Sequence, residues 1–144
     1  MTTPDYETDF YAWTRAQADF LRRGAWHGVD RAHVAEEIED LGNEQRFTIE
    51  SHLERLLTHL LKWRDDPAQD PRRLWRLTIR HARREIAKRA RGSLQDHPAQ
   101  YLATAYRHAR EDAADETGLP LDTFPEACPW SVVQVLEANF WPEA

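Results

Sequence analysis

Cysteine, glycine and long apolar runs are all scarce in this sequence of 144 residues. The single cysteine, Cys128, cannot form a disulfide within the chain, which fits a reducing compartment and favours a cytoplasmic protein. No stretch approaches the roughly 18 consecutive apolar residues that span a bilayer. The first ten residues lack the basic and apolar segments of a secretory signal. We therefore expect neither a membrane protein nor a secreted one.

The scarcity of glycine also bears on the fold. Only five glycines occur, and the eight prolines lie mostly between segments of helical periodicity, a distribution that favours helices. Apolar residues make up 41% and charged residues 31% of the chain, a balance typical of a folded protein rather than a disordered one. We expect an all-α protein, a compact bundle of about four main helices, with residues 1–144 forming a single helical domain.

Four periodic segments predict the main helices, at about residues 5–23, 30–63, 71–91 and 98–117. Asp30 and Asp70 are the expected N-caps of the second and third. The second is unusually long, and Gly42-Asn43 predicts a kink or break within it. A short helix is expected at 131–137.

The C-terminal segment has a different composition. Three prolines between residues 119 and 130 exclude a long helix there. Phe124, Trp130, Phe140 and Trp141 are nevertheless too apolar for a free end. We expect this Pro-rich aromatic tail to pack across the bundle.

Several motifs together resemble a known family. They are Tyr6-Glu-Thr-Asp-Phe-Tyr-Ala-Trp13, Val34-Ala-Glu-Glu-Ile-Glu-Asp-Leu-Gly42, Leu56-Leu-Thr-His-Leu-Leu-Lys-Trp63, Arg83-Arg-Glu-Ile86 and Glu116-Thr-Gly-Leu-Pro120. The pattern is similar to the bacterial helical family catalogued as domain of unknown function 29, over nearly the whole chain. The resemblance implies a helical bundle from a bacterium and brings no catalytic residue with it.

Charge is distributed unevenly along the chain. Residues 62–91 carry eleven Lys or Arg and four acids, a net charge of +7, although the whole chain has a net charge of −6. Two candidate sites follow from this division. The first is a polar cluster of Glu36, Glu37, Asp40, His59 and Arg83. The second is a basic binding face on the third helix, formed by Arg73, Arg76, Arg80, Arg84 and Arg91.

Both candidate sites have a structural alternative. Arg72, Arg76 and Arg83 could pair with Glu36, Glu37 or Asp40, so that the acidic second helix neutralises the basic third one. His59, at the edge of a leucine-rich stripe, needs a hydrogen-bond partner if it is buried. We expect a carboxylate or a tyrosine from another helix to supply it.

The sequence has no complete catalytic or metal-binding motif. Glu36 and Asp40 lie one turn apart and could share a hard cation with further ligands. However, the Glu-x-x-His pairs of di-iron bundles, phosphate-binding glycine loops and zinc spacings are all missing. We assign no metal and no cofactor. Whether the protein is an enzyme stays open, although the lack of a complete catalytic motif favours a protein that is not one.

Three functional hypotheses remain. The leading one is a non-catalytic protein-interaction module that binds another protein or a second copy of itself, because six tryptophans exceed what a small core easily buries. The second is a metal-binding or metal-assisted hydrolytic bundle using Glu36, Glu37, Asp40 and His59. The third is nucleic-acid or phosphate binding through the arginine-rich third helix, against which the pI of about 5.6 counts.

Overall fold

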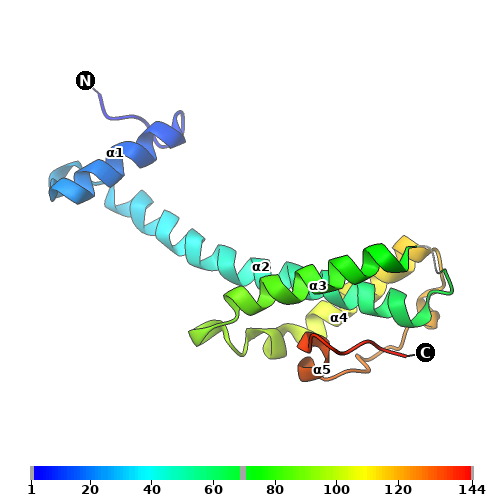
Figure 1. Ribbon diagram of the computed structural model, residues 1–144. Helices are drawn as coiled ribbons and strands as arrows, with labels where there is room; N and C mark the ends of the chain where they lie inside the picture. The colour runs from blue at the N-terminus through cyan, green and yellow to red at the C-terminus, as the bar shows by residue number, and fades with distance from the viewer. Residues whose placement is uncertain (1, 69–70, 144) are drawn as a thin grey trace. The chain divides into compact units, whose positions relative to one another are not determined.

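The computed structural model describes residues 2–68 and 71–143. It is all-α, and its four main helices are α1 (Phe10–Arg23), α2 (Arg31–Asp65), α3 (Arg72–Arg89) and α4 (His97–Thr117), as Figure 1 shows. The chain divides into two compact units, residues 1–44 (unit 1) and 45–144 (unit 2), so that α2 contributes to both. Each unit is described by itself, and the expectation of a single domain over 1–144 stays a prediction.

Unit 1 begins with a turn and not with the helix expected from residue 5. The carboxylate of Asp5 accepts hydrogen bonds from the amides of Glu7 (2.8 Å) and Thr8 (3.0 Å), which holds this segment in a turn. Asp9 therefore becomes the N-cap of α1, and its side chain accepts from the amide of Ala12. The helix ends as predicted at Gly24, whose φ of 68° lies in the left-handed region.

Within unit 1 the backbone at Gly28 lies close to the ring of Phe20. The 3₁₀ helix η1 (Trp26–Gly28) connects α1 to α2, and the ring of Phe20 lies against Gly28. A Cβ atom at Gly28 would be 2.9 Å from Cδ1 of that ring. The next helix starts where the sequence predicts it, because Oδ1 of Asp30 accepts from the amide of His33 (3.3 Å).

Helix α2 runs without interruption through Gly42, so of the kink or break expected there the break does not occur, and the kink stays a prediction. Glycine lowers helix stability by about 1 kcal/mol relative to alanine. A break would leave about four amides and four carbonyl groups without their helical partners. The surrounding Leu41, Glu44 and Gln45 are good helix formers, and together these terms favour continuity.

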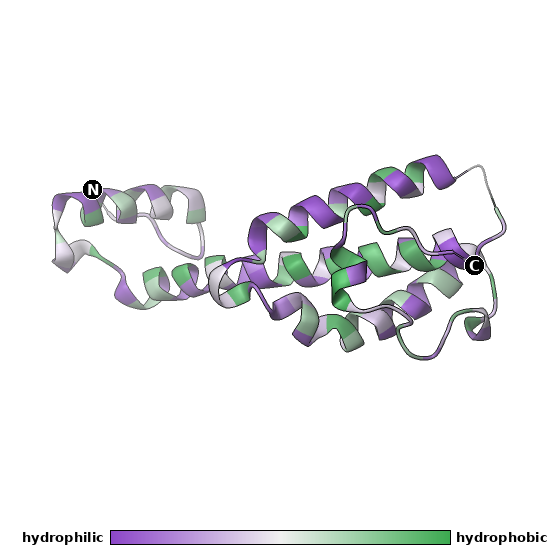
Figure 2. Ribbon diagram, turned by 60° about the horizontal axis from the view of Figure 1, so that its bottom comes forward, coloured by the Kyte–Doolittle hydropathy of each residue, from purple (hydrophilic) through white to green (hydrophobic). Residues whose placement is uncertain are grey.

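The core of unit 2 is formed by the second part of α2 together with α3 and α4. Figure 2 shows apolar residues recurring along each of these helices. In α4 the buried positions Ala105, Ala109 and Ala113 are small, which lets neighbouring side chains approach the helix closely. The fully buried large side chains of α2 and α3 in this core are Ile49, Leu53, Leu56, Leu57, Leu60, Leu61, Ile79 and Ile86.

The helices of unit 2 end largely as the sequence predicts. Helix α4 stops at Gly118, which has a φ of 74°, and α3 follows Pro71. Asp70, the expected cap of α3, lies outside the described residues. The short helix α5 (Val132–Leu136) begins at Ser131, which forms a capping box with Gln134.

The C-terminal segment packs on the core of unit 2. Phe124, Trp130 and Val135 are buried, and Phe140 and Trp141 pack against the same cluster at partial exposure. Side chains of α4 also hold its backbone, since Tyr106 Oη donates to the carbonyl of Pro125 and Arg110 Nε to that of Phe124 (3.0 Å).

Arg83 is the main polar link between α3 and this segment. Its guanidinium donates to the carbonyl oxygens of Val135 (2.9 Å), Ala138 (3.5 Å) and Phe140 (2.9 Å). The guanidinium carbon also lies 5.5 Å from the ring centroid of Trp141. Burial lowers the pKa of Arg83 to about 10, so the side chain stays cationic at neutral pH.

Two glycines provide a matched pair of substitutions in α2 and the segment before it. Gly28→Ala forces the Phe20 ring to shift and should destabilise unit 1 by about 1–3 kcal/mol. Gly42→Ala meets nothing within 4 Å and should stabilise α2 by about 0.5–1 kcal/mol. Hydrogen exchange of the α1 and α2 amides measures both effects, and equal protection in the two variants would contradict the packing described here.

The three-carbonyl contact of Arg83 makes a second prediction. Arg83→Lys keeps the charge but loses the planar guanidinium, and it leaves buried and partly buried carbonyl groups without donors. We expect the free energy of unfolding, measured with urea, to fall by about 2–3 kcal/mol. Arg84→Lys, at an exposed neighbouring position, should change it by less than about 0.5 kcal/mol. Similar losses in the two variants would show that Arg83 does not anchor the tail.

Candidate functional site

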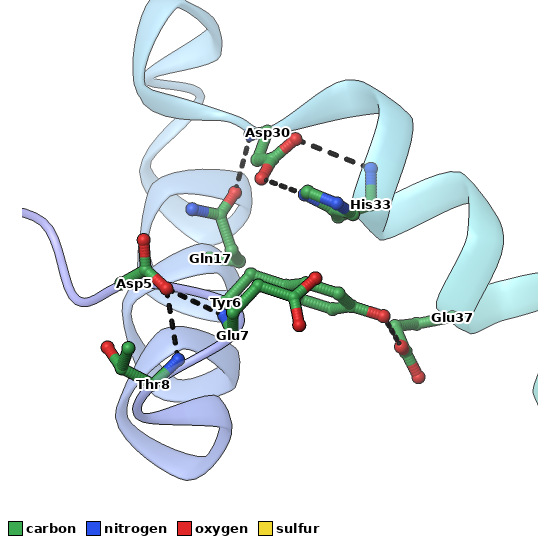
Figure 3. A network of polar contacts seen from close by, with 8 residues as sticks. All are labelled: Asp5, Tyr6, Glu7, Thr8, Gln17, Asp30, His33 and Glu37. Atoms are coloured by element: carbon green, nitrogen blue, oxygen red, sulfur yellow. Dashed lines mark hydrogen bonds and ion pairs between the residues drawn. The ribbon is translucent and has the colours of Figure 1, made fainter.

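A network of polar and aromatic side chains connects the two helical segments of unit 1 (Figure 3). Tyr6 Oη donates to a carboxylate oxygen of Glu37, across 31 positions of sequence. The Tyr6 ring stacks on His33 at a centroid distance of 3.8 Å and meets Trp13 edge-on at 4.8 Å. This network positions the start of α2 within unit 1.

A second set of contacts holds the Nδ1 edge of the His33 ring. His33 Nδ1 lies 2.7 Å from Oδ2 of Asp30, and the amide of Asp30 donates to Oε1 of Gln17 (2.7 Å). The hydrogen bond to Asp30 raises the pKa of His33 above its ordinary value, and the same bond lowers the pKa of Asp30. The hydrogen bond to Glu37 similarly raises the pKa of Tyr6. These groups are connected to one another and are all partnered.

An exposed apolar surface lies on unit 1 beside this network. Among residues 2–44 only Trp13 and Gln17 are buried, whereas Trp26 is 67% and Ile38 62% exposed. A groove of about 510 Å³ runs along this surface. It is lined by Leu21, Trp26, Val29, Arg31, Val34, Ala35 and Ile38. We call this groove together with the exposed Leu41 the unit 1 apolar surface.

The net charge of the protein resides in the same unit. Residues 1–44 contain ten acidic residues and four arginines, a net charge of −6. Residues 45–144 contain fifteen residues of each sign and are neutral overall. On α2, Glu36 and Glu39 are exposed, with Glu39 directly following Ile38. The unit 1 apolar surface therefore has Glu39 at its edge and lies on a unit of negative net charge, with Arg31 among its lining residues.

The residues of the candidate polar cluster belong to different units and have different partners. Glu36, Glu37 and Asp40 lie in unit 1, where Glu37 bonds to Tyr6 and the other two are exposed. His59 and Arg83 lie in unit 2. The partners that the structure gives Arg83 are backbone carbonyl oxygens, not carboxylates.

His59 obtains its hydrogen bond within its own helix. Its Nδ1 lies 2.9 Å from the carbonyl oxygen of Arg55, so the carboxylate or tyrosine expected from another helix is not the partner found there. Burial lowers its pKa. His59 also borders a cavity of about 340 Å³ that is lined by Glu54, Asp112 and Glu116 among other residues. The exposed Glu116 is paired with Lys62 at 3.0 Å.

The basic face proposed on the third helix divides into two sets. Arg76 lies over the rings of Trp63 (5.6 Å) and Trp141 (5.2 Å), and Arg72 lies over Trp63 (4.5 Å). Arg80 and Arg84, which are exposed as Arg76 is, border a cavity of about 350 Å³ beside Asn139. Arg73 and Arg91 are also exposed. All five arginines of the proposed basic face are therefore exposed, and Arg76 also lies over two aromatic rings.

Within the described residues, no group of three or more His, Cys, Asp or Glu side chains is placed to hold a metal ion. Cys128 donates weakly to the carbonyl of Trp130 (3.4 Å), and burial raises the pKa of its thiol. A raised thiol pKa leaves little of the nucleophilic thiolate. None of the described helices is long and apolar enough to cross a bilayer.

Sequence reasoning missed two features of these surfaces. The contact between Tyr6 and Glu37 joins residues distant in sequence, and no local pattern indicates it. Leu74 and Leu77 fall outside the apolar stripe of the third helix, and the structure exposes them by 66% and 57%. Because both leucines lie outside the stripe, the sequence itself indicated that they would be exposed.

The contact between Asp30 and His33 predicts a pH dependence. The raised pKa of His33 means that its contribution to stability is complete below pH 6.5 and is lost as the pH rises through the folded value. NMR titration should give His33 a pKa above 6.5, and Asp30→Asn should return it towards that value while keeping the N-cap. Asp40→Asn serves as the control and should leave it unchanged. A wild-type value at or below 6.5 would contradict the contact.

Comparisons with known proteins identify a family and no characterised relative. Neither a curated protein nor a solved structure matches the chain. Residues 6–141 match the family described as a domain of unknown function, DUF29, which covers nearly the whole chain. The protein is therefore a member of the DUF29 family.

Proposed function

We propose that this DUF29 protein is a non-catalytic protein-interaction module, and that the unit 1 apolar surface is its binding face. The observation that carries the proposal is the apolar groove on unit 1, with Trp26 and Ile38 exposed by 67% and 62%. A contiguous exposed apolar area bordered by charge is typical of a protein–protein contact. Tryptophan is also the residue type most enriched among those that dominate binding energy.

The small interior of unit 1 supports this proposal. A segment of this length with two buried side chains has little hydrophobic stabilisation of its own. Covering Trp26, Ile38 and Leu41 would remove apolar area from water, at roughly 25 cal/mol for each Å². A partner would therefore stabilise the unit to which it binds.

The charge of unit 1 defines the chemistry of the partner. Exposed Glu39 lies one turn from Ala35 at the edge of the apolar surface, and the unit has a net charge of −6 even though Arg31 lines the groove. An acidic partner would be repelled, whereas arginine or lysine side chains would be attracted. The partner that fits is an amphipathic helix whose apolar face is flanked by basic residues, because such helices bind apolar grooves through their apolar face.

The polar side chains support a binding role over a catalytic one. Tyr6, His33 and Arg83 all use their polar atoms in contacts that hold the fold together. A bacterial and cytoplasmic setting is part of the same proposal, and the free thiol of Cys128 fits it.

Two designed peptides test this function. Both are helices with the same leucine stripe, one flanked by arginines and the other by glutamates. The arginine peptide should bind and shift the indole NMR signal of Trp26, assigned from Trp26→Phe, and the glutamate peptide should not. Ile38→Gln with Leu41→Gln should weaken binding at least about tenfold, because the apolar contact is lost.

Leu121→Gln provides the matched control, since Leu121 is also exposed but lies in unit 2. It should bind the arginine peptide as the wild type does. Binding that is equal for the two peptides, or unaffected by the substitutions at Ile38 and Leu41, would overturn the proposal. So would an unchanged Trp26 signal at millimolar peptide.

A further inference from the structure

The outer face of α3 has the chemistry of the partner just described. Along it, Arg73, Leu77, Arg80 and Arg84 recur at intervals of three or four residues, which places them on one side of the helix. Leu74 lies three residues before Leu77 and extends the same side. All five are exposed. We call these five residues the α3 outer face.

The two leucines of this face have no evident role within unit 2. Leu74 is 66% and Leu77 57% exposed, whereas Trp75, Ile79 and Ile86 on the opposite side of the helix are buried. Helix α3 therefore has a core side and a second apolar strip that faces outward. An outward strip of leucines on an otherwise charged helix indicates a contact surface.

The arginines of this face are available for pairing. Arg80 and Arg84 form neither an ion pair nor a hydrogen bond with any residue that the structure describes, in contrast to Arg83 between them. Residues 72–89 contain eight basic residues and one acid, a net charge of +7. Opposite charge therefore lies on the two surfaces that also expose apolar side chains.

We propose that the unit 1 apolar surface of one copy binds the α3 outer face of a second copy. This inference rests on the proposed function and names the partner. Leu74 and Leu77 supply apolar side chains for the groove between Trp26 and Ile38. Arg80 and Arg84 supply positive charge that complements Glu39 at the edge of the groove and the net charge of −6 of unit 1.

Charge favours this pairing over the symmetric alternatives. Two unit 1 apolar surfaces facing each other would bring two net charges of −6 together, and two α3 outer faces would bring together two helices of +7. Like-charge contacts of this kind are costly. The contact between unlike surfaces avoids both, and each copy of the chain presents both surfaces at equal concentration.

The first test measures mass as a function of concentration. Sedimentation of the full chain should show a concentration-dependent dimer or larger species that dissociates as salt is raised, because screening weakens the charged part of the contact. A monomer over the whole range up to about millimolar concentration would overturn the inference. The inference would also be overturned if reversing the charge of Arg80 and Arg84 left the dimer unchanged.

A charge exchange tests which surfaces meet. The first variant is Arg80→Glu with Arg84→Glu, and the second is Glu39→Arg. Each alone should associate at least about tenfold more weakly than the wild type, because each places like charges across the contact. Mixing the two variants should restore association, since both contacts in the mixed species again join opposite charges.

Arg55→Glu with Arg107→Glu is the matched control, because both arginines are exposed in unit 2 outside α3. It should associate as the wild type does. Failure of the mixture to recover would overturn the inference, as would equal weakening in the control.

Two other results distinguish self-association from the alternative functions of these surfaces. A chain that binds the arginine peptide but stays monomeric would retain the proposed function and lose the self-association. A monomer whose Arg80 and Arg84 bind a single-stranded RNA, with the steep salt dependence of phosphate contacts, would assign the α3 outer face to a nucleic acid and overturn the inference.

Discussion

The contact of Arg83 with the tail is the interaction on which the architecture of unit 2 depends. The segment after Gly118 is rich in proline and offers few regular backbone hydrogen bonds, so its carbonyl groups need donors from elsewhere. Arg83 supplies three of these contacts from a buried position on α3. A planar guanidinium can serve several acceptors at once, which an ammonium group cannot do in the same geometry. The apolar tail residues Phe124, Trp130 and Val135 are thereby held over the core.

The same contact explains how α3 uses its arginines. Burying a cation is costly unless it is well partnered, and here carbonyl oxygens and the Trp141 ring offset that cost. Arg72 and Arg76 extend this inner set by stacking on Trp63. Arg73, Arg76, Arg80 and Arg84 are nevertheless exposed. The basic charge of α3 is thus partly structural and partly free, a division that a count of charges does not reveal.

Signals carried by a few neighbouring residues were predictable from the sequence. Gly24 and Gly118 end helices because they adopt positive φ, and Ser131 begins one because its side chain caps the first turn. Asp5 and Asp9 show the limit, since both can cap a helix and the turn around Asp5 decides between them. The partners of His59 and Arg83 were not predictable, because backbone carbonyl oxygens occur at every residue and only the folded chain selects among them. The uninterrupted passage of α2 through Gly42 likewise depends on the residues around it.

Helix α2 illustrates what an apolar stripe leaves open. Val34, Ile38 and Leu41 follow the same periodicity as Leu53, Leu56 and Leu60, yet the second set is fully buried and the first is partly or largely exposed. Periodicity specifies which side of a helix is apolar, whereas burial depends on what covers it. In unit 2 the cover is α3, α4 and the tail. In unit 1 the uncovered stripe coincides with the whole net charge of the protein, and concentrating like charge raises the free energy of a folded unit. A helix with an apolar strip flanked by basic residues would both cover the apolar stripe and neutralise the negative charge. The two exposed surfaces of this chain are therefore best understood together.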